Sequence, residues 1–169
     1  MAYERAALSA ACLDWLDRPD LHDRAIAATL TFRPYRDELN DRGVTRFRLN
    51  PLICQEAIRV FLRRLDTAAY GKDAIRRGRK LGAIPIREGG MGRGDKHLHY
   101  HAQLQVPEHE SVAGWKLVAA NEWSRIDWAS QKQNCFRDVS DPNWLSYILK
   151  LRDKPDFQDS VDFVNLRIN

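Results

Sequence analysis

The sequence is poor in cysteine and has no long apolar run. Its three cysteines, Cys12, Cys54 and Cys135, are odd in number, widely spaced and form no CxxC pair. This argues against a zinc ribbon and against a disulfide framework, so we expect free thiols in a reducing compartment. No segment approaches transmembrane length, and Asp14 and Asp17 come before any apolar core could form, so we expect neither a membrane span nor a signal peptide. The expected location is the cytoplasm.

Internal repeats and low-complexity tracts are also missing, so no pattern divides the chain. Of its 169 residues, 44% are hydrophobic and 30% charged, which is typical of one globular domain spanning 1–169 with its own core. The formal net charge of +4 suits a polyanionic partner. A mildly basic solvated surface explains the same charge, so composition alone does not identify a partner.

Hydrophobic periodicity predicts helices and strands in alternation. We expect helices at 3–17, 51–71, 110–126 and 143–151, and strands at 25–32, 81–88, 97–106, 134–139 and 163–168. Asn50-Pro51 and Asp141-Pro142 are typical helix starts, with the first residue of each pair as the N-cap. Hairpins mixed with helices favour the α+β class, with a central antiparallel sheet covered by helices and a core at about 25–152.

Three histidines alternate along the predicted strand 97–106. His97, His99 and His101 are two residues apart, and on an extended strand such residues share one face. Neutral imidazole is the commonest metal ligand among side chains, so the pattern predicts a metal site. Three ligands from one strand fit poorly around one ion. We therefore expect two of the histidines to bind the metal, and the third to face the substrate or to support a ligand.

Such an ion needs an oxygen ligand if it is Mg²⁺ or Mn²⁺. Glu88 ends the preceding predicted strand, and the glycine-rich segment 89–95 would return the chain as a hairpin to bring His97 or His99 close to it. Glu88 is therefore the predicted acidic ligand, and Asp95 the weaker alternative. An ordinary carboxylate at a strand end is the competing interpretation.

Tyr147 and Lys150 are three residues apart on the predicted helix 143–151, so they share a face. Trp144 and Lys154 continue the same side. The Tyr-x-x-Lys spacing alone is common and fits amphipathic packing, but the histidine strand upstream makes it more specific. A phenol, whose ordinary pKa is about 10, needs help to act as a nucleophile at neutral pH. A divalent ion that polarises a phosphodiester, with Lys150 as a fixed positive charge, would let Tyr147 attack it.

The basic segment 72–80 precedes the candidate active strands. Its cations are predicted either to contact DNA or to form a solvated loop, and both interpretations stay open at this point. The DNA-contacting set that we predict comprises Arg76, Arg77, Arg79, Lys80, Lys154 and Trp144.

These motifs resemble those of the HUH endonucleases, specifically the single-tyrosine Rep proteins that start rolling-circle replication. Motif two of that family is His-hydrophobic-His on a strand, which fits 99–101 or 97–99, and motif three is Tyr-x-x-Lys on a helix, which fits 147–150. Residues 29–32 resemble motif one. The resemblance covers about 25–152, and we favour His99 with His101 because the strand continues beyond them, although the position of Glu88 fits His97 with His99 better.

The resemblance implies a central antiparallel sheet, a Mg²⁺ or Mn²⁺ ion, and single-stranded or hairpin origin DNA as substrate. It implies a 5′-phosphotyrosine intermediate on Tyr147 in the bacterial host of a plasmid or phage. No helicase domain follows the motifs, which leaves recruitment of a host helicase or an excised nuclease domain. Transposases and relaxase-like nucleases share the same parts and stay open as alternatives.

Two other classes of protein also fit parts of the pattern. A non-catalytic nucleic-acid-binding module would use a basic face and stacking aromatics such as Trp144 and Tyr35, without a metal. A hydrolytic metalloenzyme would bind Zn²⁺ through the histidines and use water as the nucleophile, which would make Tyr147 dispensable.

Overall fold

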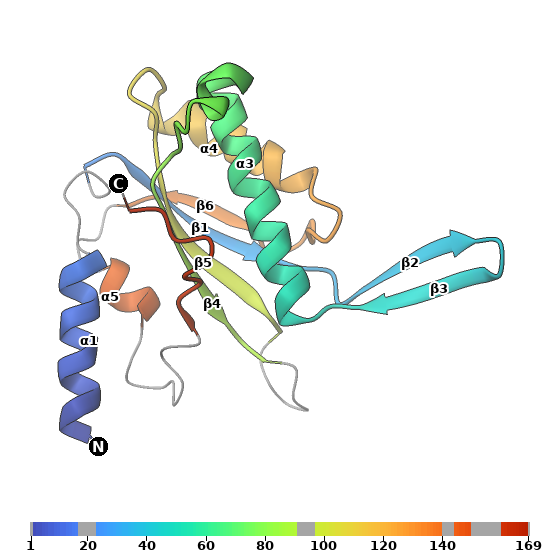
Figure 1. Ribbon diagram of the computed structural model, residues 1–169, viewed down its shortest axis with the longest axis horizontal. Helices are drawn as coiled ribbons and strands as arrows, with labels where there is room; N and C mark the ends of the chain where they lie inside the picture. Colours follow the sequence, from blue (N-terminus) through green and yellow to red (C-terminus); the bar gives the residue numbers. More distant parts are fainter. Residues whose placement is uncertain (1, 17–22, 91–96, 140–143, 150–159, 169) are drawn as a thin grey trace.

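The computed structural model describes residues 2–16, 23–90, 97–139, 144–149 and 160–168 (Figure 1). Its elements are α1 (Ala2–Leu16), β1 (Ala25–Thr31), β2 (Tyr35–Asn40), β3 (Gly43–Arg48), α3 (Pro51–Arg76), β4 (Ala83–Glu88), β5 (His99–Gln105), α4 (Val112–Ser124), β6 (Cys135–Asp138) and α5 (Trp144–Leu149). Four strands form one antiparallel sheet in the order β4-β5-β1-β6, and β2 pairs with β3. The predicted α+β class with an antiparallel sheet is confirmed.

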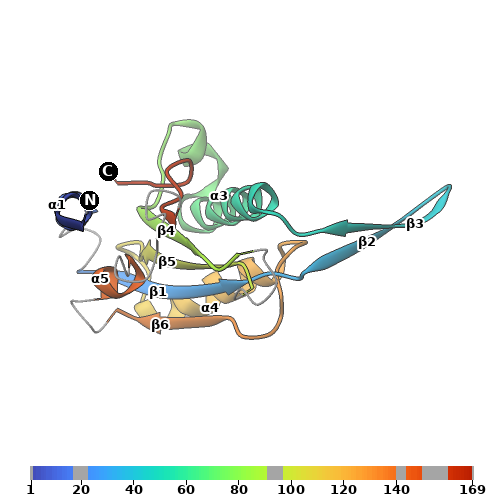
Figure 2. The same cartoon turned by 90° about the horizontal axis from the view of Figure 1, so that it is seen from below.

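One face of the four-stranded sheet packs against α3 and α4, and Figure 2 shows α3 lying along that side. Helix α3 begins as predicted, because the Asn50 side chain accepts a hydrogen bond from the Ile53 amide at 2.9 Å. It runs to Arg76 across a kink at Gly71, whose φ of 73° is available to glycine at no steric cost. Edge-to-face contacts of Trp123 with Phe61 and Phe32 join both helices to the strands. This face is the main core.

The other face of the sheet is covered only in part, by a smaller apolar cluster. Ile84 and Ile86 of β4 pack there against Leu145 and Ile148 of α5, and Leu16 of α1 joins them. The predicted N-terminal helix at 3–17 is confirmed with a shift of one residue, whereas the predicted cap Asp141 lies outside the described residues. Elsewhere on this face, β5 carries polar side chains, among them His99, His101 and Gln103, beside small residues of β1.

The predicted C-terminal strand at 163–168 is wrong. The segment makes only isolated bridges to β4, between Val161 and Ile86 and between Arg167 and Ala83, with a turn between them. The turn forms because Asp162 is buried and its carboxylate accepts hydrogen bonds from Tyr100, Gln55 and Asn165. A buried carboxylate is costly without hydrogen-bond donors. Satisfying the Asp162 carboxylate is therefore more favourable than continuing a regular strand ladder through this segment.

The β2–β3 hairpin was not predicted, and it projects from the body of the molecule as a two-stranded arm (Figure 1). Both of its faces are largely solvent-exposed, so its sequence lacks the alternation of apolar and polar residues that marks a half-buried strand. The available signal was its turn, Asn40-Asp41-Arg42-Gly43, where Gly43 has a φ of 110°.

The structure bears on two expectations from composition, which concern membrane-spanning helices and the state of the cysteines. Within the described ranges no helix is long and apolar enough to cross a membrane. The three cysteines are free thiols, as expected. Burial raises the pKa of the Cys54 thiol to about 12, which keeps this side chain protonated and chemically inert at neutral pH.

Candidate metal centre and tyrosine helix

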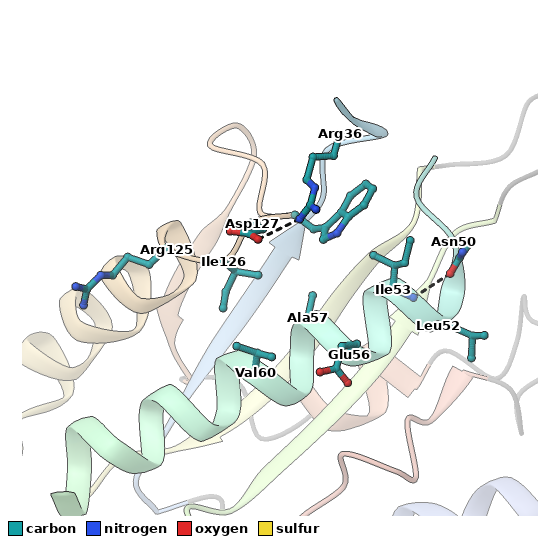
Figure 3. Close-up of a pocket in the computed structure, with 11 residues that line it drawn as sticks. Arg36, Asn50, Leu52, Ile53, Glu56, Ala57, Val60, Arg125, Ile126 and Asp127 are labelled. Carbon is teal, nitrogen blue, oxygen red and sulfur yellow. Dashed lines mark hydrogen bonds and ion pairs between the residues drawn. The ribbon is translucent and has the colours of Figure 1, made fainter. Parts of the chain in front are cut away.

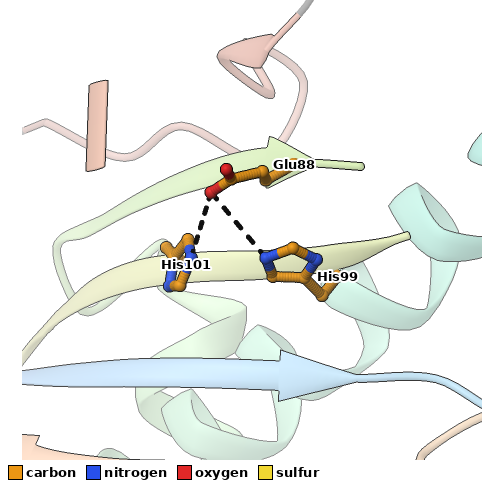
Figure 4. Close-up of side chains that lie close together, drawn as sticks. All are labelled: Glu88, His99 and His101. Carbon is orange, nitrogen blue, oxygen red and sulfur yellow. Dashed lines mark ion pairs between the residues drawn. The ribbon is translucent and has the colours of Figure 1, made fainter. Parts of the chain in front are cut away.

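Glu88, His99 and His101 converge on the partly covered face of the sheet (Figure 4). Glu88 of β4 lies opposite His99 in the ladder, and His101 is two residues further along β5, so all three side chains point to the same side. The Glu88 Oε2 atom is 3.7 Å from His99 Nε2 and 3.2 Å from His101 Nε2. One ligand atom from each residue lies within 4.8 Å of the others. This spacing suits a metal ion at their centre.

Hydrogen bonds on the far side of each ring fix how the two imidazoles face Glu88. His99 Nδ1 is 2.8 Å from the carbonyl oxygen of His97, and a carbonyl only accepts, so Nδ1 carries the proton and Nε2 presents a lone pair. His101 Nδ1 is 3.2 Å from the Thr29 hydroxyl of β1, which can accept from it in the same way. Outer partners of this kind orient metal-binding histidines.

When both rings carry their proton on Nδ1, two imidazole lone pairs face a carboxylate oxygen. These groups repel one another unless a proton on a ring or a bound cation lies between them. The side chains are only 15–17% exposed, so water screens that repulsion weakly. Two histidines and one carboxylate are a donor set that divalent ions accept, and three ligands leave coordination positions for a substrate oxygen or water.

The choice among the three histidines follows from where the strand begins. Strand β5 starts at His99, and the His97 side chain is exposed ahead of it. In the described part of the chain, the group of possible ligands comprises Glu88, His99 and His101. The His97 ring is not part of this group, and the His97 backbone carbonyl oxygen contacts His99 Nδ1 instead. The alternative ligand Asp95 lies outside the described residues.

Helix α5 carries Tyr147 close to this group through a chain of ring contacts. The Trp144 ring meets His101 edge-on, with centroids 6.1 Å apart, and Tyr147 stacks on Trp144 at 5.6 Å and 23°. On the opposite side of the helix, Leu145 and Ile148 are buried and hold it to the sheet. The Tyr147 side chain is 51% exposed, so a macromolecular substrate can reach it. Lys150 and Lys154 lie outside the described residues.

The structure does not bring the basic segment to the metal group. Arg76 ends α3, and Lys80 precedes β4, whereas Glu88 lies at the other end of that strand (Figure 1). A strand of this length spans about 17 Å. Arg79 lies over the Tyr70 ring at 4.1 Å, and Arg76 pairs with Asp73 at 3.5 Å. Arg77 and Lys80 are exposed at the same end.

A separate cavity of about 510 Å³ lies between the first half of α3 and residues 125–128 (Figure 3). Apolar side chains, among them Ile53, Val60 and Ile126, line it, and an Arg36–Asp127 contact of 3.0 Å borders it. None of the three metal-ligand candidates lines this cavity. It is therefore distinct from the metal group.

Sequence reasoning missed the role of Thr29, which the sequence shows only as part of an apolar strand. The ladder aligns Thr29 with His101, a pairing that no single strand reveals.

Comparison of the chain with known protein families, with curated proteins and with solved structures finds no match.

Proposed function

We propose that this protein is a metal-dependent, sequence-specific single-stranded DNA endonuclease and strand transferase, with Tyr147 as nucleophile. The observation that carries the proposal is the ring chain from His101 through Trp144 to Tyr147. Through the intervening Trp144 ring, it links a solvent-accessible phenol to a carboxylate and two imidazoles whose ligand atoms lie close together. The HUH endonucleases, which the motifs resemble, combine the same residue types.

In this proposal the Tyr147 oxygen attacks the scissile phosphorus in line with the leaving oxygen. The bond from phosphorus to the 3′ oxygen breaks, the phenol proton passes to water, and the 3′ oxygen takes a proton to become a free 3′-OH. Tyr147 then holds the 5′ phosphate, and attack by a 3′-OH in the reverse sense rejoins a strand. A divalent ion supplies polarisation of the phosphate and offsets its developing charge.

The roles of neighbouring residues follow from their chemistry. Glu88, as a hard oxygen donor, favours Mg²⁺ or Mn²⁺ as the ion. Trp144 offers a ring on which a base can stack, and such stacking tolerates any base. Lys150 keeps its predicted role as a fixed positive charge near the phosphate. Initiation of rolling-circle replication with a host helicase is the proposed setting, and transposition is its alternative.

A denaturing gel tests the proposal. The protein is incubated with a pool of labelled single-stranded and stem-loop DNAs, with Mn²⁺ or with EDTA. We expect an SDS-resistant band that requires Mn²⁺ and disappears in Tyr147→Phe, while Tyr70→Phe, a matched tyrosine on α3, retains it. Cleavage at the normal rate by Tyr147→Phe would overturn the assignment of the nucleophile.

A second candidate is a hydrolytic zinc enzyme, favoured by the two-histidine, one-glutamate donor set, which also suits catalytic Zn²⁺. Water would then be the nucleophile and no adduct would form. The same gel separates the two functions, because metal-dependent cleavage without an adduct, unchanged in Tyr147→Phe, is expected only of the hydrolase.

A further inference from the structure

The β2–β3 arm has no layer packed on it in the described structure. Its two strands pair only with each other, and Leu39 is 84%, Val44 68% and Phe47 42% exposed. An isolated two-stranded hairpin is marginally stable in water. An arm of this kind therefore gains order from a partner that contacts it.

The arm projects from the end of the sheet that carries the metal group. Thr31, the last residue of β1, pairs with His99, which in turn pairs with Glu88. The arm begins four residues after Thr31, at Tyr35 (Figures 1 and 2). A substrate that reaches the metal group therefore has the arm beside it.

Positive charge dominates the arm and its root. Residues 33–48 contain five arginines and three acidic residues. Arg46 is held by Asp37 through two hydrogen bonds, and Arg36 is held by Glu38 and Asp127. Arg42 and Arg48 are exposed, and within the described ranges their guanidinium groups have no hydrogen bond or ion pair. Two exposed cations without counter-charges favour a polyanion over an apolar or basic partner.

The shape of the arm indicates whether that polyanion is single-stranded or double-stranded. Single strands bind in positively charged grooves that track the backbone, whereas this arm is a projection with two exposed faces. The major groove of duplex DNA is about 12 Å wide and admits a two-stranded β-ribbon. We propose that the β2–β3 arm binds the duplex part of the DNA substrate, the stem beside the single-stranded segment that reaches Tyr147. This inference rests on the proposed function.

The test compares a stem-loop that has a single-stranded tail with the tail alone, by fluorescence anisotropy in EDTA so that no cleavage occurs. We expect Arg42→Ala with Arg48→Ala to weaken stem-loop binding about tenfold and to reduce the salt slope by about two, one for each lost phosphate contact. Binding of the tail alone should stay within about twofold of the wild-type affinity.

The matched control is Arg59→Ala with Arg63→Ala, which removes the same charge from exposed positions of α3 that lie outside the predicted DNA-contacting set. It should leave stem-loop affinity nearly unchanged, and melting temperatures should agree among all three proteins. Equal losses in both double variants, or an equal loss for stem-loop and tail, would overturn the proposal. So would a dimer that dissociates in Leu39→Asp while stem-loop affinity is retained, because the arm would then serve a second copy of the chain.

Failure of the arm inference and failure of the proposed function give different results. If the covalent adduct forms but the arm variant binds the stem-loop normally, the inference about the arm is wrong and the proposed nuclease function is supported. If the arm variant loses stem-loop binding but wild-type protein forms no adduct with any DNA, the arm binds DNA in a protein that is not a transferase.

Discussion

The two faces of β5 differ although their residues alternate along one strand. Tyr100, Ala102 and Leu104 are at most 2% exposed beneath α3 and α4. His99 and His101 keep 15–17% exposure on the other face, which α5 covers only in part. One face therefore supplies stability through apolar burial, while the other holds polar groups in positions suited to a ligand.

This division predicts that substitutions on the two faces affect different measurements. Changes on the polar face should alter metal binding and cleavage and leave the free energy of unfolding almost unchanged. Changes on the apolar face should do the reverse. A substitution that moves both quantities together would show that the two faces are coupled.

The largest effect is expected from removal of a candidate ligand. His101→Ala should slow Mn²⁺-dependent DNA cleavage by about a hundredfold or more, because an ion that polarises the phosphate is worth several kcal/mol. His97→Ala is the matched control, since this ring lies outside the ligand group, and it should cleave normally. Cleavage assays and thermal melts on both variants check the prediction, and normal cleavage by His101→Ala would contradict it.

A core substitution on the opposite face should act on stability instead. Leu104→Ala removes a side chain that is 2% exposed and leaves a cavity, so the free energy of unfolding should fall by about 2–5 kcal/mol. Urea denaturation measures this loss. Mn²⁺ affinity, measured below the unfolding transition, should stay within about twofold of wild type, given that sites without shared partners behave independently. A parallel loss of affinity would break the division between the faces.

A smaller effect is expected from the partner that orients His101. Thr29→Val keeps the shape of the side chain but removes the hydroxyl 3.2 Å from His101 Nδ1. Loss of such an outer hydrogen bond typically weakens metal affinity about 10- to 100-fold. Thr29→Ser retains the hydroxyl and should bind like wild type. Titration with Mn²⁺ compares the three proteins, and equal affinities would mean that the Thr29 hydroxyl does not position the ring.

The smallest effect concerns Tyr100, which donates to the buried Asp162 carboxylate at 3.2 Å. Tyr100→Phe should cost about 1 kcal/mol of unfolding free energy at neutral pH without changing cleavage. Burial, and then the charge of Asp162, raise the pKa of Tyr100 above its usual value. The folded state therefore resists ionisation of this phenol.

The same raised pKa gives Tyr100 a signature in alkaline solution. Its stabilising contribution is fully present below the unfolded pKa of about 10 and is lost as the pH rises beyond it. Unfolding free energies measured from neutral to alkaline pH should fall less steeply in Tyr100→Phe than in the wild-type protein. Identical slopes would assign the alkaline loss to other groups.

Sequence patterns predicted the elements whose residues carry a local signal. Strict alternation identified β5, and the Asn50-Pro51 pair located the start of α3 because its cap is made within four residues. Glu88 was found because a hairpin brings a strand end back to its neighbour. Which histidines join it depended on where β5 begins, and that is set by pairing with β1 and β4.

The failures share a different physical cause. At the turn 163–165, two of the three side chains that donate to Asp162 come from residues more than 60 positions away, so the local sequence reveals little of it. The β2–β3 arm was not predicted because neither of its faces is buried in the described structure. Long-range polar networks and strands exposed on both faces leave little periodicity in a sequence.

The central claim is that Glu88, His99 and His101 hold a divalent ion on the polar face of the sheet. Titration of Mn²⁺ followed by electron paramagnetic resonance tests it most directly, without any need for the DNA sequence. We expect one tightly bound Mn²⁺ per chain in the wild-type protein and in His97→Ala, and loss of that ion in Glu88→Gln and in His101→Ala. Equal Mn²⁺ binding by all four proteins would show that these three residues do not hold the ion.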